Sequence, residues 1–135
     1  MCYHQTMRKF RFNKLIRDKI IKDMVRNGQS PVYRILDNDE YIEELKKKIL
    51  EEAAEIPLED GDEITEKLAD IEEIIDVLLK ALKVKKSQIL ALRKKKNLER
   101  GSFKKKIFVD TVDAPEDSKW LEYYLKFPQK YPEIK

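Results

Sequence analysis

The sequence predicts an all-α protein: a bundle of four main helices, with a short fifth helix near the C-terminus. Apolar residues recur at steps of three and four over long stretches, as they do along one face of an α-helix. Of the 135 residues, 41% are charged and only 3 are Gly and 5 are Pro, which is typical of helices with charged outer faces. This length predicts one domain of ordinary size with a core of its own.

Charge and cysteine content narrow the classes of function. Lys and Arg number 29 against 26 Asp and Glu, and this net charge of +3 is too balanced to favour a nucleic-acid partner. No apolar run approaches the roughly 20 residues that span a bilayer, and residues 1–12 lack the apolar stretch of a signal peptide. A single cysteine, Cys2, suits a reducing compartment, and with His4 it makes no usual zinc site. We therefore expect a cytoplasmic protein with no membrane partner.

Residues 1–12 are expected to form an arm, and the first helix is expected at about residues 14–27. Asn13 is its predicted N-cap and Gly28 its predicted end. Basic residues on its first turns have two interpretations, a solvated charged face or phosphate binding, because a helix N-terminus favours anions. These basic residues are Lys14, Arg17 and Lys19.

Two short segments rich in β-branched and aromatic residues, 31–36 and 106–109, are expected to be strands. They could pair as a small two-stranded ribbon. The acidic turn at 37–39 is expected to cap the helix that follows it.

The second predicted helix, from about residue 39 to residue 56 or 58, carries glutamates beside a clean apolar stripe. The glutamates are Glu51, Glu52 and Glu55. Glu52 flanks the stripe and is expected to point inward, with Glu55 next. The alternative for all three is exposed salt bridges with neighbouring lysines such as Lys47 and Lys48.

The third predicted helix, at about residues 62–82, is apolar over more than half of its surface. Such a helix is expected to be buried on two sides, one in the internal core and one in a subunit interface. Lys67 and Asp70 fall on or beside the apolar sector, where a charge is costly unless it is paired or binds a metal. Two interpretations stay open: a buried Lys67–Asp70 ion pair, or Asp70 as a metal ligand with Glu66 and Glu73 on its border.

Carboxylates clustered on two packed helices repel one another unless a cation lies among them. Oxygen ligands of this kind suit Mg²⁺ or Mn²⁺. The residues thus predict a magnesium site on two helices of the bundle.

The fourth helix is expected to begin after Ser87, its predicted N-cap, and to reach about Arg100, with Gly101 ending it. Residues 113–135 form an aromatic tail with a short helix that starts at 116–118. We expect this tail to pack on the domain or on a partner subunit.

Five motifs in the same order resemble the MazG-like group of all-α NTP pyrophosphohydrolases, which is similar to phosphoribosyl-ATP pyrophosphohydrolase. They are NKLIRDKI at 13–20, RIL at 34–36 with EY at 40–41, KILEEAAE at 48–55, LAD at 68–70 with EII at 73–75, and Lys96 with RGSF at 100–103. The resemblance covers about residues 13–109, so the domain is expected at 13–112 and the tail at 113–135.

The resemblance implies a homo-oligomer, a dimer or a tetramer, that hydrolyses nucleoside triphosphates with Mg²⁺ to a monophosphate and pyrophosphate. The implied role is removal of unwanted nucleotides rather than histidine biosynthesis. Carried over by position, Glu52, Glu55 and Asp70 would hold the metal, and Glu51 or Glu52 would orient the attacking water. The implied phosphate contacts are Lys14, Arg17, Lys96 and Arg100.

One departure from the group's pattern concerns the ExxD half of the metal motif, where Lys67 stands in place of the expected glutamate. A protonated lysine cannot bind a cation. Glu73, or Glu66 as the second choice, could substitute for the missing ligand, or fewer ions could bind. Lys67 could instead neutralise a triphosphate oxygen. The alternative is a catalytically degraded helical module that binds a nucleotide or a partner without turnover.

Overall fold

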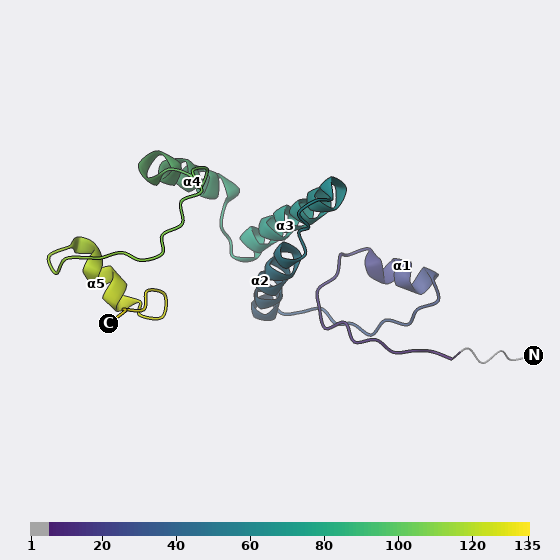
Figure 1. The fold of residues 1–135 in the computed structure, drawn as a ribbon. Coiled ribbons are helices and arrows are strands. Elements are labelled where there is room, and N and C mark those ends of the chain that lie inside the picture. Colours follow the sequence, from purple (N-terminus) through teal and green to yellow (C-terminus); the bar gives the residue numbers. More distant parts are fainter. Residues whose placement is uncertain (1–5) are drawn as a thin grey trace, which may run out of the picture. The chain divides into compact units, whose positions relative to one another are not determined.

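The structure is a computed structural model that describes residues 6–135 (Figure 1). Its helices in chain order are α1 (Ile20–Arg26), α2 (Asn38–Ala54), α3 (Gly61–Ala81), α4 (Lys86–Arg100) and α5 (Lys119–Lys126). Residues 6–135 contain no strand, and the all-α prediction is confirmed. None of these helices is both long and apolar enough to cross a bilayer. The predictions for Cys2 and His4 lie outside the described residues.

The chain divides into two units, Met1–Lys95 and Lys96–Lys135, which we describe separately. The first unit holds α1, α2, α3 and the greater part of α4. The second holds the last turn of α4 and the whole of α5. The predicted limits of the arm, the domain and the tail, at residues 12 and 112, stay predictions.

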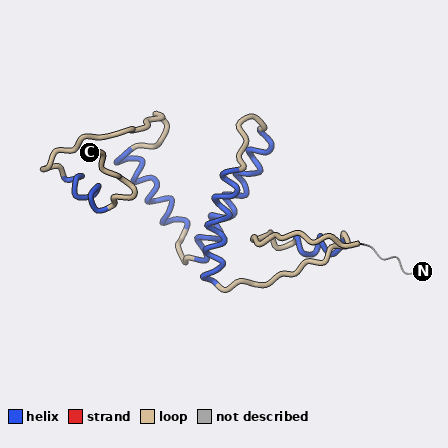
Figure 2. The backbone as a smooth tube through the Cα atoms, turned by 60° about the horizontal axis from the view of Figure 1, so that its bottom comes forward, coloured by secondary structure: helices blue, strands red, loops and turns tan. Residues whose placement is uncertain are grey.

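Helices α2 and α3 pack against each other as an antiparallel hairpin (Figure 2). The Asn38 side chain at the start of α2 donates a hydrogen bond of 3.5 Å to the carbonyl of Ala81 at the end of α3. Leu45 and Ile74, 3% and 8% exposed, are the buried hydrophobic residues of the described chain. The core of the first unit therefore lies between these two helices.

The bounds of α2 and α3 follow from their caps. The Asp37 carboxylate accepts a hydrogen bond of 2.9 Å from the backbone N–H of Glu40, as the acidic turn predicted. The Asp60 carboxylate accepts one of 3.2 Å from the backbone N–H of Glu63. Helix α3 was expected to within one residue of its bounds, whereas α2 was expected to reach residue 56 or 58 and ends at Ala54.

The prediction of a first helix starting at residue 14 is wrong, because α1 begins at Ile20 and has 7 residues. Asn13 has a φ of 45°, in the left-handed region, whereas an N-cap residue is extended. Lys14 and Arg17 precede the helix and reach across to carboxylates of α2 and α3. The C-terminal end was predicted correctly, since Gly28 follows α1 with a φ of 78°.

The prediction of a two-stranded ribbon is not supported, because segments 31–36 and 106–109 are both loops. Val32 and Ile35 are 102% and 88% exposed, so the first segment has no surface against which to bury a strand face. Lys106 has a φ of 60°, which interrupts an extended backbone at the start of the second. An isolated ribbon of two strands is marginal in water without such burial.

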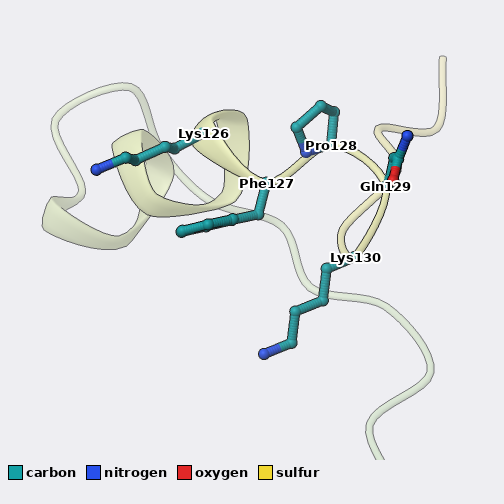
Figure 3. A pocket seen from close by; sticks show the side chains of 5 residues that line it. All are labelled: Lys126, Phe127, Pro128, Gln129 and Lys130. Atoms are coloured by element: carbon teal, nitrogen blue, oxygen red, sulfur yellow. The ribbon is translucent and has the colours of Figure 1, made fainter. Parts of the chain in front are cut away.

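In the second unit, α5 has Ser118 as its N-cap, within the predicted start at 116–118, and ends before Phe127. The Tyr123 ring of α5 packs at a tilt against two rings beyond the helix, with its centroid 5.1 Å from that of Phe127 and 5.7 Å from that of Tyr131. A hollow beyond the helix end is lined by Lys126, Phe127, Pro128, Gln129 and Lys130 (Figure 3). These five residues include no carboxylate and none of the predicted site residues.

Candidate functional site

The candidate site is built on the end of α2 that faces the first half of α3. Glu52 is buried there, with 6% of its surface exposed, and the expectation that it points inward is confirmed. Glu55 was expected to be the second most inward-pointing of the three glutamates, and this is wrong. Its side chain is 48% exposed, whereas that of Glu51 is 33% exposed. Glu55 is the C-cap of α2, one residue beyond the last helical residue, Ala54.

Lys67 extends from α3 to the two glutamates of α2. Its ammonium Nζ donates to Glu55 Oε2 at 2.7 Å and to Glu52 Oε2 at 3.2 Å. The Lys67–Asp70 ion pair considered from the sequence does not form in the structure, because the lysine side chain points across the hairpin. One cation therefore lies between two carboxylates predicted as metal ligands.

Asp70 has a different partner, from a distant part of the chain. The Arg17 guanidinium Nη2 donates to Asp70 Oδ1 at 2.6 Å. Arg17 lies in the segment before α1, so this contact ties that segment to α3. The hydrogen bond to Asp70 raises the pKa of Arg17, and the negative charges of Glu73 and Glu52 raise it further.

Glu51 and Glu52 have further lysine partners. Lys14 Nζ lies 3.3 Å from Glu51 Oε1, and Lys48 Nζ lies 3.6 Å from Glu51 Oε2 and 3.8 Å from Glu52 Oε1. The expected pairing of Lys48 with these glutamates is confirmed, whereas Lys47 pairs with Glu44 instead.

The charges of the site balance within the protein itself. Each of its carboxylates contacts at least one cation; the carboxylates are Glu51, Glu52, Glu55 and Asp70, and the cations are Lys14, Arg17, Lys48 and Lys67. The hydrogen bond from Lys67 lowers the pKa of Glu55, and the bonds to Glu55 and Glu52 raise the pKa of Lys67. Glu55 and Lys67 are therefore both ionised at neutral pH.

The arrangement bears directly on the predicted metal site. Among residues 6–135, no three or more Asp, Glu, His or Cys side chains are grouped as they would be around a metal ion. Glu52 and Glu55 nevertheless direct one oxygen each at a single cation, the Lys67 ammonium. Mg²⁺ is commonly held by one or two carboxylates together with substrate phosphates, so this donor pair fits it chemically once the ammonium moves away.

The other predicted residues lie outside this network. Glu73 is exposed on α3, one turn beyond Asp70, and Glu66 is exposed on the same helix. Lys96 and Arg100 are exposed on the part of α4 that belongs to the second unit. Their roles as metal ligand and phosphate contacts stay predictions.

The sequence reasoning missed the position of Lys67 between the glutamates of the other helix. Its signal was visible in the chain, since a lysine on an apolar sector needs a carboxylate partner. Asp70 is the acidic residue three positions away on the same helix and was therefore considered as the partner. In the structure, Lys67 pairs instead with glutamates of the opposite helix.

Comparisons of the chain with protein-family models, with curated proteins and with solved structures found no match.

Proposed function

We propose that this protein is a Mg²⁺-dependent nucleoside triphosphate pyrophosphohydrolase that converts a triphosphate and water to a monophosphate and pyrophosphate. The observation that supports it best is that the segment before α1 contacts both α2 and α3 through ion pairs. Lys14 and Arg17, predicted for phosphate, contact Glu51 and Asp70, predicted for catalysis and metal. Residues assigned to one reaction from separate motifs are thus in direct contact.

The balanced charges supply a physical reason for binding such a substrate. A metal–triphosphate complex brings one multivalent cation and one multivalent anion together. The carboxylates of α2 can exchange their lysines for the metal, while Lys14 and Arg17 exchange carboxylates for phosphate oxygens. Each charged side chain of the site would then keep a partner of opposite sign. A metal or a phosphate that bound alone would leave some of these side chains without one.

In this proposal each residue has one role. Glu52 and Glu55 hold Mg²⁺, Asp70 and Glu73 complete the acidic side of the site, and Glu51 orients the attacking water as general base. When bound, Mg²⁺ supplies neutralisation of the charge that develops on the phosphate oxygens. Lys14 and Arg17 bind the phosphate chain, and phosphate binding by Lys96 and Arg100 of the second unit stays a prediction. Mn²⁺ could replace Mg²⁺ at oxygen ligands of this kind.

We also propose that the chain works as a homo-oligomer, a dimer or a tetramer. Leu68, Ile75 and Leu82 lie seven residues apart along α3 and its C-cap, and they are 51%, 41% and 48% exposed. Residues seven apart share one helix face, so these side chains form an apolar stripe that α2 leaves uncovered. A second copy of the chain would bury it.

A second candidate function rests on Lys67. Its two hydrogen bonds occupy both carboxylates that would hold the metal. In this alternative the fold is kept for binding a nucleotide or a partner, and no hydrolysis occurs.

Release of pyrophosphate from a panel of nucleoside triphosphates, with and without Mg²⁺ or Mn²⁺, separates the two candidates. The proposal predicts metal-dependent release by the natural chain, lost in Glu52→Gln and retained in Glu43→Gln, which changes an exposed glutamate on the same helix. A silent natural chain with an active Lys67→Glu variant would favour the degraded module. Silence of all variants across the panel would contradict the enzymatic function.

A further inference from the structure

The Lys67 ammonium occupies the point at which the oxygens of Glu52 and Glu55 converge. Its side chain is only 20% exposed, and Glu52 beside it is buried. A second lysine, Lys48, approaches Glu52 on its other oxygen at 3.8 Å. A divalent ion that arrived alone between these glutamates would therefore face an ammonium in the same place and another close by.

We propose that Lys67 is a built-in cation that weakens the binding of a divalent metal alone and couples the binding of metal to that of triphosphate. This inference rests on the proposed function and adds to it a mode of regulation of the same site. The metal can enter only if the ammonium leaves, and the ammonium can leave only if another anion receives it. The phosphate oxygens of the substrate are that anion.

The chemistry of lysine suits this exchange. Its ammonium is a compact charge with three donors on a flexible four-carbon stem, so it can turn from one acceptor to another without movement of α3. Arg17 and Lys14 already lie against carboxylates of the same site, and these cations draw the phosphate chain towards it. Lys67 would thus pass from the glutamates to a phosphate oxygen as the metal takes its place.

The inference differs from a purely structural role of Lys67. A structural counterion stabilises the fold, and its removal lowers the melting temperature without improving metal binding. A built-in cation opposes the metal, and its removal strengthens binding of metal in the absence of any nucleotide. Metal affinity without substrate separates these two roles.

The test is a titration of the full chain with Mn²⁺ alone, read by electron paramagnetic resonance of the free ion. Lys67→Met, which keeps the stem and removes the charge, is expected to bind Mn²⁺ roughly tenfold more tightly than the natural chain. Lys67→Arg, which keeps the charge, and Lys80→Met, on an exposed position of the same helix, are expected to match the natural chain. Circular dichroism checks that each variant keeps its helices.

A second measurement uses inorganic triphosphate, which supplies the phosphate oxygens without any base. In equilibrium dialysis, Mn²⁺ is expected to increase retention of triphosphate by the natural chain, and to increase it less in Lys67→Met. Equal Mn²⁺ affinity of Lys67→Met and the natural chain would overturn the inference. Neither readout needs turnover, so failure of the proposed hydrolysis is detected separately, by absence of pyrophosphate from the natural chain.

Discussion

At the scale of single residues, the charged side chains of the candidate site form ion pairs with side chains from other segments of the chain. Glu52 is buried at the helix contact, and the chain supplies Lys67 and Lys48 as its counterions. A buried carboxylate without such partners would be strongly unfavourable. In the proposed function the same cations would control entry of the metal, so the proposal links stability and function at this one glutamate.

The sequence identified the acidic residues of the site but not all of their partners. Glu52 was expected to point inward from its place beside the apolar stripe, and it does. The pairings of Lys67 with Glu55 and of Arg17 with Asp70 depend on how segments distant in the sequence meet. Helical periodicity defines the face of one element and contains no information on which side chain of another element lies opposite.

A pH-dependent prediction concerns Arg34 and Glu40, which join the loop before α2 to its first turn. The hydrogen bonds from Arg34, one of them 2.8 Å long, lower the pKa of the Glu40 carboxyl. A lowered pKa in the folded state means that the pair stabilises the fold at neutral pH and that this contribution is lost as pH falls below about 4. In an NMR titration, the pKa of Glu40 is expected to rise in Arg34→Met. An unchanged pKa would show that the pair does not persist in solution.

At the scale of the elements, capping residues located most but not all helix ends correctly. Asp37 caps α2, α5 begins after Ser118 within the expected 116–118, and Gly101 follows α4 with a φ of 81°. The prediction that Ser87 caps α4 is wrong, because the helix begins at Lys86 and Ser87 lies inside it. The start of α1 was predicted incorrectly, because Lys14 and Arg17 bind carboxylates of the hairpin instead of extending a helix. Tertiary ion pairs there outweigh local helix propensity.

The α2–α3 hairpin is expected to depend on Leu45. This side chain is 3% exposed between the two helices, so Leu45→Ala leaves a cavity and is expected to lower the free energy of unfolding by about 2–5 kcal/mol. Leu50, 71% exposed on the same helix, is the matched control, and Leu50→Ala is expected to cost less than about 0.5 kcal/mol. Urea unfolding followed by circular dichroism measures both. Equal effects of the two substitutions would contradict the packing of α2 on α3.

At the scale of the whole molecule, the proposed oligomer explains why α3 is apolar on two sides. One side packs on α2 around Ile74, and the other carries the exposed stripe that includes Leu68 and Ile75. Sequence composition predicted this second apolar side, because more than half of the helix surface is apolar. It does not reveal how many copies assemble, since that depends on the geometry of contacts between chains.

Association of the chain is expected to depend on that stripe. Light scattering coupled to size-exclusion chromatography should give a multiple of the chain mass for the natural protein and a smaller mass for Leu68→Lys, because a charge at the interface would be desolvated. Leu50→Lys places the same charge on an exposed position of α2 and should leave the mass unchanged. A natural chain that elutes as a monomer would contradict the proposed oligomer.

The proposed reaction is hydrolysis of nucleoside triphosphates between the α- and β-phosphates. Phosphorus NMR of the products formed with Mg²⁺ tests it most directly, because the technique distinguishes each cleavage position. The natural chain is expected to give the signals of a nucleoside monophosphate and pyrophosphate, and the Glu52→Gln variant is expected to give neither. A nucleoside diphosphate with inorganic phosphate, or an unchanged triphosphate across the panel, would contradict it.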